Sequence, residues 1–158
     1  MTEVFEVFRS ELQAYADRGI FQNLSCNIIG ENISEFKFHW MTDKQFTLRL
    51  NVIKHELELR DILPSVSFRS DMDNAFRGFI LSRCTKEIPI HRRLDGERLN
   101  IKAKNKNGNV SVLIGFSESD SCLAVKTSIN LLHEIFNNFL MEGPYQNYMV
   151  EVFNLPEE

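Results

Sequence analysis

The sequence predicts an α+β fold: a mostly antiparallel sheet, formed by a meander and a hairpin, with an N-terminal helix and a long C-terminal amphipathic helix packed on one face. Three observations predict it. Apolar residues recur with a helical period near both ends of the chain, they alternate with polar residues between, and short polar turns join the alternating segments. The 158 residues suffice for one core, so we expect residues 1–158 to form a single domain.

The first half of the chain changes from a helical period to an alternating one. Residues 3–18 place their apolar side chains on one helical face. Residues 24–28, 36–40 and 46–52 then alternate apolar with polar side chains and are separated by polar turns. This pattern indicates an antiparallel meander with one buried face.

The parity of the apolar positions changes after the third strand, because Leu57 and Leu59 are odd-numbered. The change indicates a break or bulge near residues 53–55, followed by a short strand or extended segment. Asp71 stands in the capping position of a short second helix over residues 72–80.

The second half of the chain predicts a hairpin, the long helix and a last strand. Residues 99–104 and 110–116 alternate on either side of Asn107-Gly108, a strong hairpin turn signal. Residues 120–141 then form one amphipathic helix, and residues 148–153 alternate again.

The long helix is predicted to be strongly one-sided. Its apolar face carries Cys122, Val125, Ile129, Leu132, Phe136, Phe139 and Leu140. Its polar face carries Lys126, Asn130, Glu134, Asn137 and Asn138. Such a helix needs a broad apolar surface, which the strands supply.

Composition and charge narrow the class of protein. The formal net charge of −4 disfavours generic binding to nucleic acid or a membrane surface, and no apolar run approaches the roughly 20 residues that span a bilayer. Cys26, Cys84 and Cys122 form no CxxC pair, and the N-terminus lacks a signal-peptide pattern. The cysteine pattern is best explained by reduced thiols in a cytoplasmic protein. Cys26 and Cys122 lie among the apolar positions of their segments, so we expect both thiols to be buried.

No motif predicts a catalytic, metal or cofactor site. The four histidines are scattered and none belongs to an HExxH pair, and the glycine-rich phosphate-binding motifs are missing. A Cys/His nucleophile pair remains formally open, with Cys26 or Cys84 meeting one of the histidines. The sequence leans towards a protein that is not an enzyme and needs no cofactor. The histidines are His39, His55, His91 and His133.

One segment is basic. Residues 91–106 carry six basic and two acidic residues. They are either a docking patch for an acidic segment, phosphate or nucleic acid, or a solvated strand face whose lysines discourage edge aggregation, and the second interpretation is favoured. No aromatic residues interleave with these charges, which makes nucleic acid the weakest of the three ligands. The candidate patch is Arg92, Arg93, Arg98, Lys102 and Lys104.

The predicted function is a non-catalytic, cytoplasmic protein-interaction domain that binds a protein partner or itself as a homodimer. The last strand carries apolar residues in both phases, so a two-fold dimer would cover Met149, Phe153 and Leu155. The alternative is a ligand-binding or enzymatic domain with a pocket between sheet and long helix. That pocket would be lined by Phe36, Phe38, Trp40, Leu132 and Phe136, with His39, His133 or Tyr148 supplying polarity.

In its order of elements the chain resembles the small acidic chaperones of type III secretion, which run helix, three strands, helix, two strands, helix. The resemblance implies an adaptor-like or chaperone-like dimer with apolar grooves for an extended client. The predicted last strand departs from that pattern.

Overall fold

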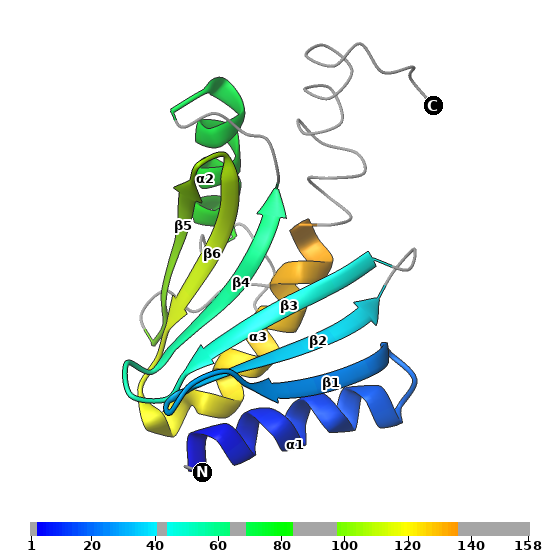
Figure 1. The fold of residues 1–158 in the computed structure, drawn as a ribbon. Helices are drawn as coiled ribbons and strands as arrows, with labels where there is room; N and C mark the ends of the chain where they lie inside the picture. The colour runs from blue at the N-terminus through cyan, green and yellow to red at the C-terminus, as the bar shows by residue number, and fades with distance from the viewer. Residues whose placement is uncertain (1–2, 41–43, 64–68, 84–97, 136–158) are drawn as a thin grey trace.

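A computed structural model of the 158-residue chain describes residues 3–40, 44–63, 69–83 and 98–135. It confirms the predicted α+β fold, with a six-stranded antiparallel sheet and helices on one face (Figure 1). The helices are α1 (Glu3–Asp17), α2 (Asp71–Ser82), the short 3-10 turn η1 (Glu118–Asp120) and α3 (Ser121–Glu134). The strands are β1 (Gln22–Ile28), β2 (Ile33–Trp40), β3 (Lys44–Asn51), β4 (Glu56–Leu63), β5 (Asn100–Lys106) and β6 (Asn109–Gly115).

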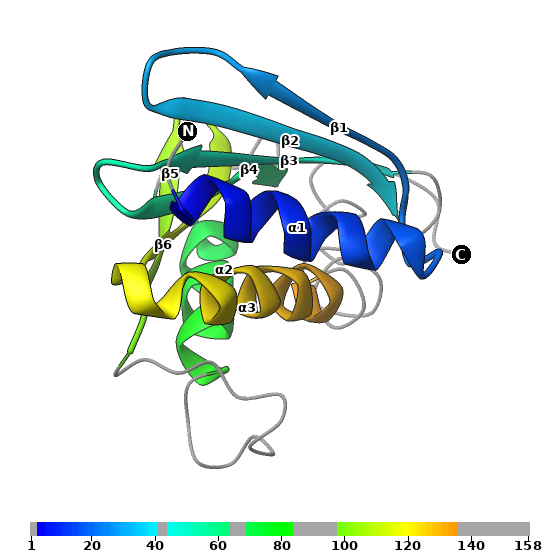
Figure 2. The same ribbon diagram turned by 90° about the horizontal axis from the view of Figure 1, so that it is seen from below.

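The sheet joins a four-stranded meander to a hairpin. Its strand order is β1-β2-β3-β4-β6-β5, so β4 pairs with β6 and the two edges are β1 and β5. Helices α1 and α3 lie side by side under the meander, and α2 packs against β5 (Figure 2). The hairpin turn is the predicted one: Asn107 and Gly108 both have positive φ, at 55° and 89°.

The covered face of the sheet is a continuous apolar surface. Across the central strands, Phe36 lies opposite Leu48, Leu48 opposite Leu59, and Leu59 opposite Val112. Each of these four side chains is at most 1% exposed. The predicted alternation of apolar and polar residues therefore marks the two faces correctly in the central strands.

The predicted break near residues 53–55 is confirmed, and it is a tight reversal rather than a bulge. The side chain of Asn51 accepts hydrogen bonds from the amides of Ile53 (3.1 Å) and Lys54 (2.9 Å), and His55 has a φ of 50°. A side chain that binds the amides two and three residues on stabilises a turn. The following segment is thus a full strand, β4, in the middle of the sheet.

Helix α2 begins one residue earlier than its sequence indicates. Ser70, not Asp71, is the N-cap, and its hydroxyl accepts a hydrogen bond from the amide of Asp73 at 3.2 Å. Asp71 is exposed in the first turn, whereas Asp73 is fully buried.

Helix α3 confirms the start of the long C-terminal helix but not all of its polar face. Lys126 and Asn130 are exposed as predicted, whereas Glu134 is only 7% exposed. Glu134 is buried because Arg83 at the end of α2 forms an ion pair with it. The predicted continuation of this helix beyond Ile135, and the strand predicted over 148–153, lie outside the described residues.

Candidate protein-interaction surface

The basic patch predicted from the sequence is only partly placed. Lys102 and Lys104 are exposed on the uncovered face of edge strand β5, as expected. Arg98 precedes the strand and points instead to Asp120, where its Nε donates to the carboxylate at 3.1 Å. The hydrogen bonds that the Asp120 carboxylate accepts from Arg98 and Ser117 lower its pKa. Arg92 and Arg93 lie outside the described residues, so a continuous patch is not established.

The structure describes the residues predicted to line a pocket in part, but not those predicted to form an interface. Met149, Phe153 and Leu155 lie outside the described residues, and their proposed dimer contact stays a prediction. Phe36, Phe38 and Leu132 are each at most 1% exposed and belong to the hydrophobic core.

The histidines do not gather into a site in the described part of the chain. His39 lies on the uncovered face of β2 beside Asn23, at 3.2 Å, whereas His133 lies on α3 against the ring of Trp40. They therefore lie on opposite faces of the sheet. The ring of His55 lies tilted against that of Phe116. Among described residues, no group of three His, Cys, Asp or Glu side chains could hold a metal ion.

The uncovered face of the sheet carries an ion-pair network. Glu35 accepts hydrogen bonds from Arg49 (2.7 Å) and Arg60 (3.1 Å), and Arg60 also pairs with Glu58 at 3.0 Å. Burial raises the pKa of the Glu35 carboxyl, but the hydrogen bonds and charges of Arg49 and Arg60 outweigh it, so the pKa lies below its ordinary value. The network keeps the centre of this face polar, which disfavours apolar docking there.

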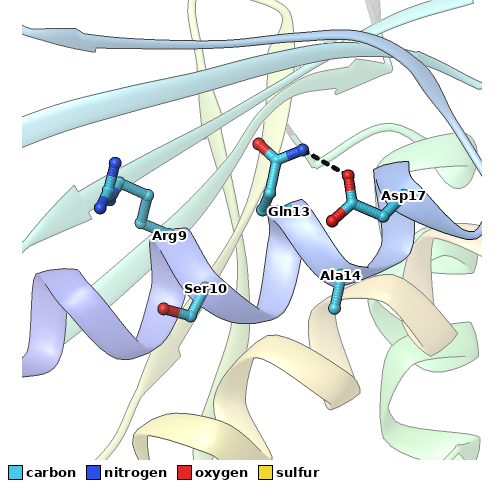
Figure 3. Close-up of a pocket in the computed structure, with 5 residues that line it drawn as sticks. All are labelled: Arg9, Ser10, Gln13, Ala14 and Asp17. Atoms are coloured by element: carbon cyan, nitrogen blue, oxygen red, sulfur yellow. Dashed lines mark hydrogen bonds between the residues drawn. The ribbon is translucent and has the colours of Figure 1, made fainter.

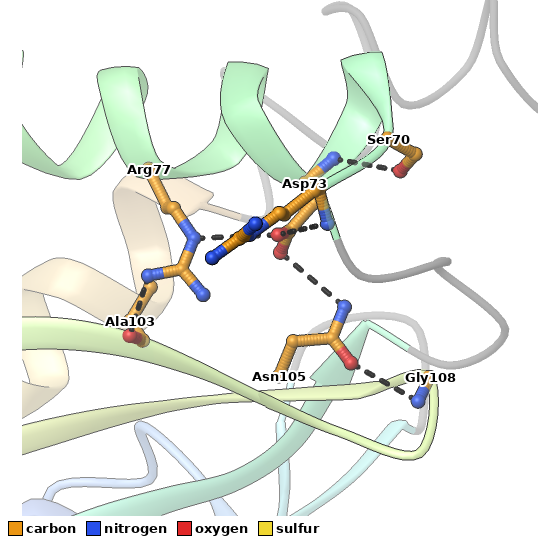
Figure 4. Close-up of polar contacts among 7 residues, drawn as sticks. Ser70, Asp73, Arg77, Ala103, Asn105 and Gly108 are labelled. Carbon is orange, nitrogen blue, oxygen red and sulfur yellow. Dashed lines mark hydrogen bonds and ion pairs between the residues drawn. The ribbon is translucent and has the colours of Figure 1, made fainter.

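The edge strand β5 is protected on both of its faces. Exposed lysines line its uncovered face, and on its covered face Arg77 of α2 donates to the carbonyl oxygen of Ala103 at 3.1 Å (Figure 4). The same arginine pairs with the buried Asp73 at 3.3 Å, and Asn105 donates to that carboxylate at 3.3 Å. Edge lysines and side chains bound to edge carbonyls discourage pairing with another strand.

Within the described residues, the opposite edge, β1, carries neither lysines nor any other charged side chain. Every residue of β1 except Leu24 is exposed, and β2 is its one strand neighbour in the described sheet. The sequence from Gly19 to Gly30 contains no charged residue. A bulge between Gln22 and Ser25 leaves Ser25–Ile28 in regular register with β2. An uncharged edge strand, paired on one side only in the described sheet, is a ready template for an added strand.

Exposed large apolar side chains gather around β1. In the part of the chain that the structure describes they are Ile20, Ile28, Ile29, Ile53 and Leu81. Ile20 and Ile29 flank the strand, Ile28 ends it, and only Leu81 lies on another element, α2. Ile53 belongs to the turn that the hydrogen bond from Val52 N to Asn32 O, at 3.0 Å, joins to the β1–β2 turn. Ile28, Ile29 and Ile53 thus lie at the end of the meander where these two turns meet.

Helix α1 carries mostly polar side chains on its flank beside this edge. A shallow hollow of about 320 Å³ runs along its exposed flank, lined by Arg9, Ser10, Gln13, Ala14 and Asp17. Arg9, Gln13 and Asp17 point towards the side on which β1 lies (Figure 3). Burial raises the pKa of the Cys26 thiol, and the nearby charge of Arg9 only partly offsets this. A strand added to β1 would therefore run beside the α1 flank.

The exposure of Cys26 corrects the prediction that this thiol is buried. Cys26 does lie on the covered face, opposite Phe36, but it belongs to an edge strand that α1 covers incompletely. Cys122 is half-buried rather than fully buried. The sequence shows that the segment from Gly19 to Gly30 is uncharged. The alternation of apolar and polar residues does not show, however, which strand forms the edge of the sheet.

A comparison of the chain with known protein families, with curated proteins and with solved structures finds no match. No helix in the described ranges is long and apolar enough to cross a membrane.

Proposed function

We propose that this chain is a non-catalytic, cytoplasmic protein-interaction domain that self-associates, in the manner of an adaptor or a secretion chaperone. The observation that carries the proposal is the asymmetry of the two sheet edges. One edge bears exposed lysines and the capped carbonyl of Ala103, whereas the other is uncharged and is bordered by exposed isoleucines. Strand addition at an open edge is a recurring mode of protein recognition, with backbone hydrogen bonds for affinity and alternate side chains for specificity.

The chemistry of the described surface supports an interaction rather than a reaction. The buried carboxylates of Asp73, Glu35 and Glu134 are all engaged by arginines in hydrogen bonds or ion pairs within the fold. Groups saturated in this way hold elements together and are not poised for proton transfer to a substrate. The two cysteines described, Cys26 and Cys122, are unbridged, which is consistent with a reducing compartment.

Sedimentation velocity over a dilution series tests this function. Wild-type protein should show a rising sedimentation coefficient with concentration. Ile28→Lys should abolish the rise, because a charge would then stand on the uncharged edge. Leu81→Lys is the matched control, since Leu81 is 67% exposed and Ile28 is 62% exposed, but Leu81 lies on α2. A wild type that stays monomeric, or an equal loss in both variants, would contradict the proposal.

A further inference from the structure

The outward backbone groups of β1 identify which residues an added strand would bind. The amide of Ile29 donates to the carbonyl of Ile33 at 3.0 Å, so Ile29 points its backbone groups towards β2. In an antiparallel pair, successive residues point these groups to alternate sides. The amides and carbonyls of Cys26 and Ile28 therefore point away from β2, towards the open edge.

The side chains of the same residues make this edge complementary to itself. Cys26 and Ile28 share the covered side of β1, where Leu24 also packs against the core, and Ser25 and Asn27 share the uncovered side. Antiparallel self-pairing brings the same short stretch of both chains together around the two-fold axis, and like charges there are destabilising. Strand β1 has no charge to oppose, whereas self-pairing of β5 would bring its lysines together.

From these observations, and on the basis of the proposed function, we infer that the partner of β1 is β1 of a second copy, paired antiparallel about a two-fold axis at Cys26. In this register Cys26 faces its own copy and Leu24 faces Ile28 of the other chain. Ser25 then faces Asn27 on the polar side. The Cys26 pair exchanges backbone hydrogen bonds in both directions, and Ile28 of each copy offers its outward amide and carbonyl to the segment around Leu24 of the other. The two sheets become one continuous sheet.

The neighbouring helix accommodates this arrangement. Arg9, whose charge acts on Cys26, forms an ion pair with Glu6 at 3.4 Å. Each arginine therefore lies near the axis together with its own countercharge. The bulge at Gln22–Ser25 limits regular pairing at the N-terminal side, so the overlap is centred on Cys26 rather than earlier in the strand.

Disulfide trapping tests the register. Residues of a hydrogen-bonded antiparallel pair have Cα atoms about 5.5 Å apart, within the range that a disulfide spans. Mild oxidation with diamide of a Cys84→Ser, Cys122→Ser protein should give a covalent dimer through Cys26. Further replacement of Cys26 by Ser should abolish that dimer. In this cysteine-free protein, Ser25→Cys together with Asn27→Cys should restore trapping, and either change alone should trap at least several-fold more slowly.

The result separates the inference from the proposed function. Concentration-dependent association that Ile28→Lys abolishes, without trapping through Cys26, would overturn the register and leave the interaction domain standing. Trapping that Ile28→Lys leaves unchanged would overturn the register as well, because the covalent dimer would then form by chance collision. A wild-type protein that stays monomeric in sedimentation would contradict both the proposed function and the inferred register.

Discussion

Arg83 at the C-terminal end of α2 donates from its Nη1 to the Oε2 of Glu134 in the last turn of α3, at 3.0 Å. The side chains are only 16% and 9% exposed, and the residues are 51 positions apart in the sequence. The pair therefore fixes α2, which packs against β5, to the helix that covers the meander.

Replacing Glu134 by Ala should lower the free energy of unfolding by about 1–3 kcal/mol or more, because it leaves the charge of Arg83 half-buried without its partner. Lys126→Ala, at an exposed position of the same helix, should change it by less than about 0.5 kcal/mol. Urea denaturation of both variants measures the difference. Equal effects would show that the ion pair contributes nothing specific.

The start of α2 predicts a contrast between two neighbouring residues. Ser70→Ala should destabilise the protein by about 0.5–2 kcal/mol, since it removes the hydroxyl that accepts the amide of Asp73. Asp71→Ala should have a smaller effect, limited to the interaction of an exposed carboxylate with the helix dipole. Thermal melts of the two variants compare their stabilities directly. A larger loss of stability in the Asp71 variant would indicate that Asp71, not Ser70, caps the helix.

Stability at acid pH should depend on Glu35. Its pKa is below the ordinary value of 4.5, so its contribution is fully present above that pH and is lost as the pH falls through the lower pKa of the folded state. Glu35→Gln should therefore flatten the decline of unfolding free energy below about pH 4.5. Glu56→Gln on the same face is the control, because Glu56 has no ion pair within the described residues. Denaturant titrations at several pH values measure the unfolding free energy of both variants. If it falls with acid equally in the Glu35→Gln and Glu56→Gln proteins, the network has no such role.

Labelling of the native thiols should follow exposure rather than the apolar phase of the sequence. In dilute protein Cys26 should react with a thiol reagent before Cys122, because Cys26 is exposed and Cys122 is half-buried. Mass spectrometry of the labelled peptides gives the order. The labelling rate of Cys26 should fall as the protein concentration rises, and a rate that stays constant would speak against its place at the two-fold axis.

Local patterns predicted those elements that local chemistry determines. Asn107-Gly108 gave the hairpin turn, because both residues adopt positive φ at little cost. The alternation around Phe36 and Leu48 gave the buried face. By contrast, the reversal after Asn51 depends on one side chain binding two amides, and a change of parity alone also fits a bulge.

The remaining differences come from long-range partners. Glu134 looked like a surface residue because its countercharge is 51 residues away. Cys26 looked buried because alternation reports the face of a strand and not its distance from the sheet edge. The candidate surface could be predicted in composition, as an uncharged run from Gly19 to Gly30, but its position required the strand order.

The pairing of β4 with β6 has a consequence for how the chain folds. Strands β1 to β4 pair with their sequence neighbours, and so do β5 and β6, whereas Leu59 meets Val112 across more than fifty residues. Closing so long a loop carries an entropic penalty that short hairpins avoid. We expect the meander and the hairpin to form early and their junction to limit the folding rate. Truncation of Val112 to Ala should then slow folding more than truncation of Phe36 to Ala, relative to the stability that each change removes.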